Sequence, residues 1–288
     1  MKVSELIKNK KITISCELFP PKQGTELASS KEIVAKMAKL KPDFMSVTYG
    51  AGGTNCDNTV EIAEEVQNVN GVTALAHLTC IASERDKIKE VLKRLKEKNI
   101  ENILALRGDM PSDGSGVHSQ TYEHACDLMR EIREYGGFCI GGACYPEGHP
   151  DAGGLDADIE ALKIKVDSGC EFLTTQMFFD NDIMYSFMYK LLRAGVEVPV
   201  CAGIMPVTKA KQIKRICALS GTHLPRRFVS IVEHFEDNPD AMRQAGIAYA
   251  TEQIIDLIAN GVNNIHIYSM NDPQIAGSIM ANLSEVIK

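Results

Sequence analysis

The sequence predicts an α/β protein built as a single (β/α)8 barrel. Eight apolar segments rich in β-branched residues recur along the chain, and helical patterns separate them at intervals of roughly 30 residues over the first part. The apolar runs are continuous rather than alternating, as expected for parallel strands that are buried on both faces. The predicted strands are 13–19, 44–49, 73–80, 102–108, 138–145, 172–178, 198–205 and 263–269.

Other arrangements fit the length but not the details of the sequence. The 288 residues would suit two average domains as well as one large barrel. No linker rich in Ser, Gly or Pro divides the chain, so we expect one domain over residues 1–288. A doubly wound sheet is the alternative fold, but the glycine fingerprint that would follow its first strand is missing.

Helical signals fill the segments around the predicted strands. The N-terminus forms a short amphipathic pattern. In 155–168 the apolar residues make one stripe, and Gly169 ends the helix. Asn238 followed by Pro239 caps a long helix that runs to Gly261.

Two segments depart from the simple alternation of strand and helix. The segment 224–236 is an additional helical stretch between the seventh and eighth strands. The segment 110–122, which is rich in Gly and Ser, is predicted to be a mobile loop just beyond the fourth strand. The predicted fold is therefore a barrel with one extra helical segment.

Composition and charge narrow the class of partner. The net charge is −7 and the pI is about 5.6, with basic residues dispersed among acids. This balance argues against nucleic acid or an anionic membrane surface as the main partner. No apolar stretch reaches membrane length, and the N-terminus lacks the apolar core of a secretion signal. We therefore expect a cytoplasmic protein that binds a small molecule.

The nine cysteines indicate neither disulfides nor a metal centre. They contain no Cys-x-x-Cys pair, and most lie inside apolar runs, as do Cys16, Cys80, Cys139 and Cys201. They are expected to be reduced core residues, and no zinc or iron–sulfur site is predicted.

Glu17 is the most informative single residue. It stands near the end of the apolar run Ile12-Thr-Ile-Ser-Cys-Glu-Leu-Phe19, which Pro20 and Pro21 cut off at once. Chemistry in a barrel of this kind gathers at the carboxyl ends of the strands, so the carboxylate is expected to face a shared pocket. A lone acid after a strand is more often a solvated turn residue, and this alternative stays open on the residue alone.

Most other predicted strands also end in polar residues. They include no pair of nucleophile and base, no His-x-His and no lysine isolated among apolar residues, so metal-pair hydrolysis and Schiff-base chemistry are poorly supported. One acid, an Arg-Gly-Asp unit and several hydrogen-bonding groups suit a flat, polar heterocycle and the movement of one proton. The strand-end residues are Glu17, Thr48, Tyr49, Gly50, Ala51, His77, Arg107, Gly108, Asp109, Tyr145, Glu147, His149, Gln176, Gly203 and Tyr268.

Eight short motifs stand in order along the chain. They are Cys16-Glu-Leu-Phe-Pro-Pro-Lys22, Ser46-Val-Thr-Tyr-Gly-Ala51, His77-Leu-Thr-Cys80, Leu104-Ala-Leu-Arg-Gly-Asp109, Tyr145-Pro-Glu-Gly-His-Pro150, Lys165-Val-Asp-Ser-Gly169, Thr175-Gln-Met-Phe-Phe-Asp180 and Gly203-Ile-Met-Pro-Val207. Each is weak alone. Together they closely resemble the methylenetetrahydrofolate reductase family in its bacterial, catalytic-domain-only form, and the resemblance runs nearly end to end.

This resemblance implies an FAD-binding (β/α)8 barrel of one-carbon metabolism and methionine biosynthesis. Such an enzyme reduces 5,10-methylenetetrahydrofolate to 5-methyltetrahydrofolate, with hydride from flavin N5 and usually with NADH or NADPH as reductant. A homo-oligomer is expected. The resemblance assigns to the flavin Thr48, Tyr49, Ala51, His77, Arg107, Gly108, Asp109, Ala125, Tyr145, His149, Ala152, Asp158 and Lys165. It assigns to the folate and the nicotinamide Gln176, Gln212 and Tyr268.

The resemblance also gives the two carboxylates opposite roles. Glu17 is similar to the general acid of the family, which protonates folate N10 so that the substrate ring opens, and this role needs a raised pKa. Asp109 would stay ionised, stabilise the resulting cation and bind the pterin. Its charge near the flavin should make the cofactor harder to reduce.

Simpler readings compete with several of these assignments. His77 alone would more often be a core histidine, and His149 a turn residue. Arg107 and Asp109 could form an ion pair at the barrel rim. Tyr145 and Tyr268 could simply pack, and Asp158 with Lys165 could be a solvated helix face. His223 and His266 are expected to be structural.

The chain departs from the family pattern at two positions. Ile216 stands where some relatives carry a stacking aromatic residue, and Asp272 stands where an arginine often meets the folate tail. A partner subunit with its own redox centre is therefore an alternative electron donor. Two rival functions stay open, a pterin-binding barrel that passes methyl groups to a corrinoid protein and a non-catalytic ligand-binding subunit.

Overall fold

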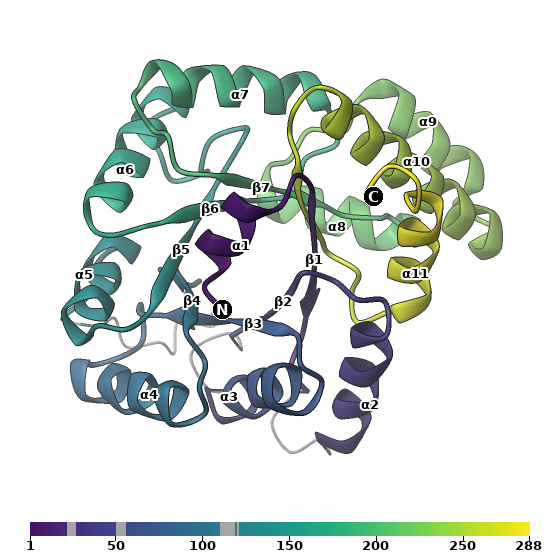
Figure 1. The fold of residues 1–288 in the computed structure, drawn as a ribbon. Helices are drawn as coiled ribbons and strands as arrows, with labels where there is room; N and C mark the ends of the chain where they lie inside the picture. Colours follow the sequence, from purple (N-terminus) through teal and green to yellow (C-terminus); the bar gives the residue numbers. More distant parts are fainter. Residues whose placement is uncertain (22–26, 50–55, 110–118, 120) are drawn as a thin grey trace.

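Eight parallel strands close into a barrel, as the sequence predicts (Figure 1). The computed structural model describes residues 1–21, 27–49, 56–109, 119 and 121–288. Each strand pairs with the next in sequence, and β1 pairs with β8 to complete the ring. The strands are β1 (Thr13–Leu18), β2 (Phe44–Val47), β3 (Thr73–Thr79), β4 (Asn102–Leu106), β5 (Cys139–Cys144), β6 (Phe172–Thr175), β7 (Val200–Ile204) and β8 (Asn264–Ile267).

Helices surround the barrel, and the predicted extra segment 224–236 is present as a helix between β7 and β8. In the described part of the chain, no helix is both long enough and apolar enough to span a bilayer. The helices are α1 (Val3–Asn9), α2 (Leu27–Ala38), α3 (Cys56–Glu64), which continues as the short π-helical segment η2 (Glu65–Val69), α4 (Arg85–Glu97), α5 (Ala125–Tyr135), α6 (Leu155–Asp167), α7 (Asn181–Arg193), α8 (Ala210–Ser220), α9 (Arg226–Phe235), α10 (Pro239–Ala259) and α11 (Pro273–Asn282).

Several strands end earlier than the apolar runs that predict them. β4 ends at Leu106 rather than at residue 108, and β6 ends at Thr175 rather than at residue 178. Beyond β4 the chain turns at Gly108, whose φ of +87° is readily accessible only to glycine. The remaining residues of each run belong to the loops that carry the candidate site. Most of the predicted mobile loop, 110–118 and 120, lies outside the described residues.

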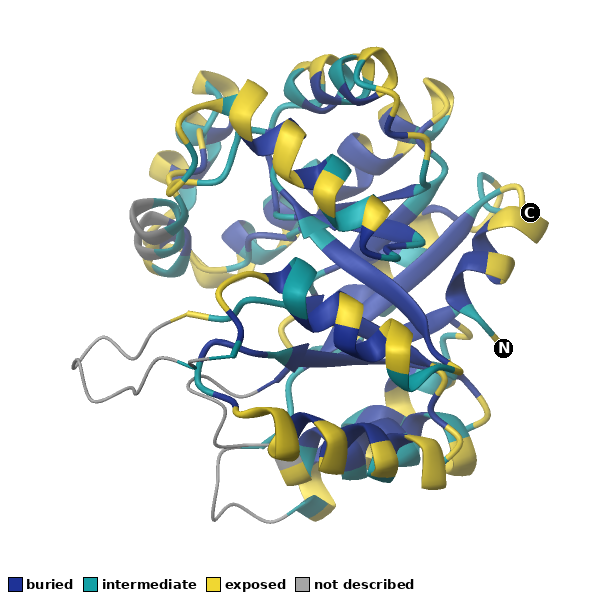
Figure 2. Ribbon diagram, turned by 90° about the vertical axis from the view of Figure 1, so that its left-hand side faces the viewer, coloured by how far each residue is buried: buried dark blue, intermediate teal, exposed yellow. Residues whose placement is uncertain are grey.

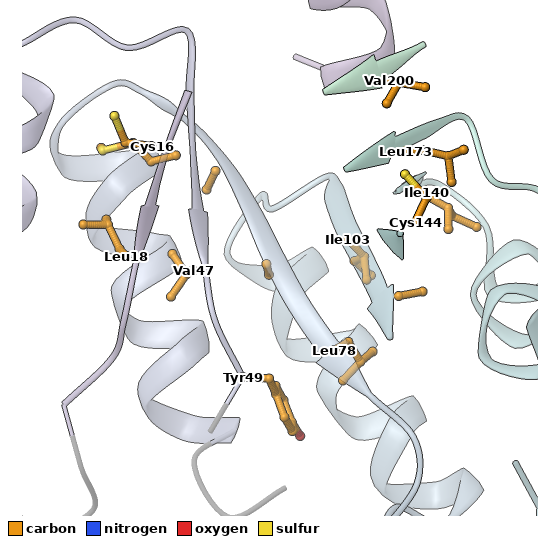
Figure 3. Packing of buried hydrophobic residues seen from close by; sticks show 14 of the residues in the cluster. Cys16, Leu18, Val47, Tyr49, Leu78, Ile103, Ile140, Cys144, Leu173 and Val200 are labelled. Carbon is orange, nitrogen blue, oxygen red and sulfur yellow. The ribbon is translucent and has the colours of Figure 1, made fainter. Parts of the chain in front are cut away.

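Successive strand residues alternate between the barrel interior and the layer under the helices. On β1, Ser15 and Glu17 face inward, while Ile14, Cys16 and Leu18 belong to the large apolar cluster shared with the helices. Figure 3 shows part of this cluster along the strands. Figure 2 shows buried strands surrounded by helices that expose only their outer faces. The barrel wall is thus apolar outside and can be polar inside.

Helix α1 covers the amino-terminal end of the barrel (Figure 1). Val3 and Ile7 pack against an apolar cluster inside that end, formed by Phe44, Leu75, Leu104, Cys139, Phe172 and Cys201. The N–H of Val3 donates to Oδ1 of Asn102 at 2.8 Å, and the hydroxyl of Ser4 donates to Oε2 of Glu171 at 2.7 Å. This apolar floor leaves the polar interior accessible from the carboxyl ends of the strands.

Candidate active site

A cavity of about 380 Å³ lies at the carboxyl ends of the strands. All eight strands or the residues that directly follow them contribute to its lining. This is the position where barrel enzymes place their chemistry. The lining residues are Glu17, Phe19, Thr48, His77, Leu104, Leu106, Asp109, Ala143, Thr174, Thr175, Gln176, Met205, His266 and Tyr268.

Glu17 occupies the inner part of this cavity. Its residue surface is 8% exposed, and burial raises the pKa of its carboxyl to about 8. Within the described residues the carboxyl makes no hydrogen bond, and Nε2 of His77 lies 3.9 Å from Oε2. At neutral pH the carboxyl is therefore mostly protonated and can donate a proton.

Two buried polar atoms of residues that line the same cavity have no hydrogen-bond partner in the described part of the protein. They are Nε2 of His77 and Oγ1 of Thr174. Burial lowers the pKa of His77 to about 3, so its imidazole is neutral at physiological pH. Because buried polar atoms in proteins are normally paired, these two atoms are suited to a polar ligand in the cavity.

Tyr268 follows β8, the strand that pairs with β1, and its side chain reaches β6. Its hydroxyl donates to the carbonyl oxygen of Thr175 at 2.6 Å. A Cβ added at Gly203 would lie 2.5 Å from a Tyr268 ring carbon and 2.5 Å from the Thr175 carbonyl oxygen, so glycine at this position makes room for the tyrosine. Gln176 follows directly, and its Oε1 accepts from the N–H of Met177 at 2.9 Å. These contacts fix the wall on the β6–β8 side.

The Arg107-Gly-Asp unit forms part of the rim after β4. Nη2 of Arg107 pairs with Oδ2 of Asp151 at 2.8 Å, so the alternative of an Arg107–Asp109 ion pair is wrong. Asp109 is exposed and contributes to the cavity lining. At Gly108 a Cβ would meet the Thr79 side chain at 2.9 Å, and the backbone therefore approaches β3 closely. The unit presents a cation and a carboxylate on either side of a glycine.

A second polar group lies beyond β5. Tyr145 and His149 stack edge to face with ring centroids 4.6 Å apart. The N–H of His149 donates to Oδ2 of Asp158 at 3.2 Å, and burial raises the pKa of Asp158. Nζ of Lys165 donates to the carbonyl oxygen of Ala143 at 2.7 Å. Asp158 and Lys165 are thus connected to the strand end and do not form a solvated helix face.

Other predicted site residues lie farther from the cavity. The side chains of Tyr49 and Ala125 belong to the apolar cluster under the helices, which leaves their backbone groups for any ligand contact. Ala152 is in the loop before α6, and its N–H donates to the carbonyl oxygen of His149. Gln212 lines a small hollow on α8 together with Ile216, Met270 and neighbouring residues. Ala51 lies outside the described residues.

Sequence reasoning did not identify Phe19, Met205 and Thr174 as cavity residues. Phe19 lies two positions after Glu17 and lines the same cavity, as alternation along an extended segment would indicate. Thr174 and Met205 carry no chemical signature that separates them from ordinary strand residues.

His266 is structural, as expected, yet it also lines the cavity. Its Nδ1 lies 2.7 Å from Oγ of Ser15, and its Nε2 lies 3.1 Å from Oγ of Ser46. The Ser15 hydroxyl proton goes to the carbonyl oxygen of Ile265, so Nδ1 carries the imidazole proton and Nε2 accepts from Ser46. His266 therefore joins β1, β2 and β8 directly below Glu17.

Two other possible sites, a second hollow and a metal centre, are less well supported than the central cavity. A hollow of about 350 Å³ lies between α7, α9 and α10, but its main charged pair, Arg227 and Glu252, is already satisfied. Among the described residues no group of three or more His, Cys, Asp or Glu side chains is arranged to hold a metal ion. The central cavity is the candidate active site.

The family model for methylenetetrahydrofolate reductase matches residues 2–284. The chain belongs to this family. Methylenetetrahydrofolate reductase (NADH) 1 of Arabidopsis thaliana is 34% identical over 297 residues, which cover 98% of this chain and 50% of that protein. The 5,10-methylenetetrahydrofolate reductase of Escherichia coli is 32% identical over 272 residues, covering 94% of this chain and 90% of that protein. The chain spans about half the length of the plant relative.

A solved structure shares the fold. It is described as an uncharacterized protein from Clostridium thermocellum that binds two copies of 5-methyl-5,6,7,8-tetrahydrofolic acid. The two structures align with a TM-score of 0.68 at 14% sequence identity, over 99% of each chain. At this identity the likeness is one of fold alone.

Proposed function

We propose that the protein reduces 5,10-methylenetetrahydrofolate to 5-methyltetrahydrofolate with bound FAD. Family membership supports the reaction class, and one observation connects it to this chain. The carboxyl of Glu17 is buried in the central cavity with its pKa raised to about 8, so it is a proton donor at neutral pH.

Glu17 performs the step that must precede reduction. The five-membered ring of the substrate opens when N10 gains a proton, which leaves a cationic carbon on N5. Glu17 donates this proton. Its carboxyl is then negatively charged, and the nearby cation on the substrate offsets the cost of burying that charge.

The residues at the β3–β5 side fit a flavin. The buried Nε2 of His77, which has no hydrogen-bond partner among the described residues, supplies a polar contact for the ring system. Arg107 and Lys165 are cations suited to the pyrophosphate, and Asp158 is suited to a ribose or ribityl hydroxyl. When bound, the flavin supplies the hydride.

Asp109, Gln176 and Tyr268 hold the folate. All three line the cavity that contains Glu17. The ionised carboxylate of Asp109 binds the pterin and stabilises the cation that ring opening creates. Gln176 after β6 and Tyr268 after β8 provide hydrogen-bonding groups for the folate. Gln212 serves the nicotinamide from the neighbouring hollow.

NADH or NADPH is the donor in the simplest scheme, and a redox partner subunit is the alternative that Ile216 and Asp272 favour. A cytoplasmic homo-oligomer remains the expected form of the protein.

A visible spectrum of the purified protein tests the proposal. Flavin absorbance that bleaches with a reductant and recovers on addition of 5,10-methylenetetrahydrofolate is the expected result. Failure to bind FAD after reconstitution would favour a methyl-transferring pterin barrel or a non-catalytic subunit. Folate binding without flavin would select the first of these two.

A further inference from the structure

Asn271 holds the backbone of Phe19 through two reciprocal hydrogen bonds. The N–H of Phe19 donates to Oδ1 of Asn271 at 2.8 Å, and Nδ2 of Asn271 donates to the carbonyl oxygen of Phe19 at 2.8 Å. Phe19 is the first residue after β1, two positions beyond Glu17. The two partners are 252 residues apart in the sequence.

The side-chain amide of Asn271 pairs with the backbone beyond the end of β1, where β8 no longer reaches. The N–H of Thr13 donates to the carbonyl oxygen of Asn263, so alternate residues of β1 direct their backbone groups towards β8. Phe19 is in the same phase, but β8 has already ended at Ile267. The side-chain amide therefore continues the pairing of β1 beyond the end of β8.

This arrangement requires an unusual backbone. Met270 and Asn271 both adopt left-handed conformations, with φ values of +54° and +59°. Such conformations are unfavourable for residues other than glycine, asparagine and aspartate, and they persist where surrounding structure enforces them. Strain of this kind is concentrated at functional sites.

The next residue anchors the turn. Oδ1 of Asp272 accepts from the N–H groups of Gln274 and Ile275 and caps α11. The guanidinium of Arg243 on α10 donates to both oxygens of Asp272. Asn271 is thus held between the N-cap of α11, which is the next residue, and the strand end that it contacts.

The position of the Glu17 side chain depends on the backbone that carries it. The carboxyl makes no hydrogen bond to the described residues, and the ionisable groups that line the cavity with it are His77 on β3, Asp109 after β4, and His266 and Tyr268 at β8. Its position therefore follows from the backbone of β1, which pairs with β2 on one side and with β8 on the other as far as Cys16, and which Asn271 holds beyond its end.

We propose that Asn271 is a positioning residue that holds Glu17 and Phe19 in the geometry required for proton transfer to the folate. The proposal rests on the proposed function, since it assigns Asn271 to the folate half-reaction. It assigns no role to Asn271 in flavin binding or in flavin reduction.

Three variants test the two hydrogen bonds of Asn271 separately from the left-handed backbone conformation. Asn271→Gly removes both hydrogen bonds and keeps the left-handed conformation accessible, so that the loop remains able to fold. Asn271→Asp keeps the acceptor for the Phe19 N–H and loses the donor. Asn99→Gly is the matched control, because Asn99 has a φ of +58° and follows α4 at the opposite end of the barrel.

Stopped-flow kinetics of the two half-reactions provides the first measurement. In Asn271→Gly the donor should reduce the flavin at the wild-type rate. Folate reduction should be about 10- to 100-fold slower, because small displacements of a catalytic group have effects of this size. Asn271→Asp should lie between, and Asn99→Gly should match wild type. Wild-type folate rates in Asn271→Gly, or equal losses in both half-reactions, would overturn the proposal.

A titration that needs no cofactor provides the second measurement. Carbon-13 NMR of the Glu17 carboxyl in flavin-free protein, assigned by comparison with Glu17→Gln, should show a lower pKa in Asn271→Gly, because a mobile strand end is better solvated. An unchanged titration would overturn the proposal. If the wild-type enzyme does not reduce folate at all, the proposed function fails, and this titration still decides whether Asn271 positions Glu17.

Discussion

Nε2 of His77 lies 3.9 Å from Oε2 of Glu17, and both side chains are buried in the central cavity. Burial shifts their pKa values in opposite directions, raising that of Glu17 to about 8 and lowering that of His77 to about 3. Both groups are therefore uncharged between these values, and the contact is not an ion pair. At neutral pH the carboxyl therefore keeps its acidic proton and the imidazole stays neutral.

The buried carboxyl predicts a stability that depends on pH. Glu17 binds its proton more tightly in the folded protein than in the unfolded chain, where its pKa is 4.5, so stability falls as pH rises from about 4.5 to about 8. The loss is about 1.4 kcal/mol per pH unit within this window. Glu17→Gln should raise the melting temperature at pH 8 and leave it unchanged at pH 4. Equal shifts at the two pH values would contradict the assigned pKa.

The same substitution tests the catalytic role. Glu17→Gln cannot donate the proton to N10, so folate reduction should fall by several powers of ten. Flavin binding and flavin reduction by the donor should persist, because the residue serves the substrate and not the cofactor. Stopped-flow traces of the separate half-reactions measure this, and equal damage to both would remove Glu17 from the acid role.

Asp109 should control the flavin potential. Its exposed carboxylate lines the cavity and would oppose the negative charge of reduced flavin. Asp109→Asn should therefore raise the midpoint potential and slow folate reduction. Asp156→Asn is a suitable control, because Asp156 is exposed on α6 and pairs with Lys190. A potential equal to that of the control would place Asp109 away from the isoalloxazine.

Gly203 should determine the position of Tyr268. In Gly203→Ala the new methyl group would lie 2.5 Å from both the tyrosine ring and the Thr175 carbonyl oxygen, so the ring must move. We expect a higher KM for folate and a loss of stability of about 1–3 kcal/mol. Gly153→Ala has open space around the added Cβ and should change neither the KM for folate nor the stability. Wild-type folate kinetics in Gly203→Ala would show that Tyr268 does not contact the substrate.

NADH should bind weakly. Ile216 offers no aromatic ring for stacking, and the carboxylate of Asp272 is engaged with Arg243 and with the start of α11. Missing contacts at remote parts of the ligands reduce binding more than chemistry, so long polyglutamate tails should also gain little affinity. Anaerobic titration with NADH measures this. Rapid flavin bleaching at micromolar NADH would show that no partner protein is needed.

The fold was predictable because its signal repeats. Each strand is a continuous apolar run buried on both faces, and only a barrel or a doubly wound sheet buries eight of them. The strand ends were less predictable because apolar residues continue past them. Phe178 and Phe179, for example, follow β6 and are buried, so hydrophobicity alone cannot mark where the pairing of β6 with its neighbouring strands ends.

The cavity lining was predictable where a polar side chain stands at a strand end, as for Glu17 and Tyr268. The pairing of Arg107 with Asp151 was not, because the partner lies in a distant loop. The contact between Asn271 and Phe19 could not be predicted from the sequence, since Phe19 contributes only its backbone and any residue except proline could stand there.

The helix at the base of the barrel also has a consequence for folding. Val3 and Ser4 form their hydrogen bonds with residues that are 99 and 167 positions later in the chain. During synthesis the apolar face of α1 therefore emerges long before Glu171 and the last strands exist, and it stays unprotected in the meantime. Docking of α1 and the pairing of β1 with β8 are late, long-range events, so refolding should be slow and sensitive to protein concentration.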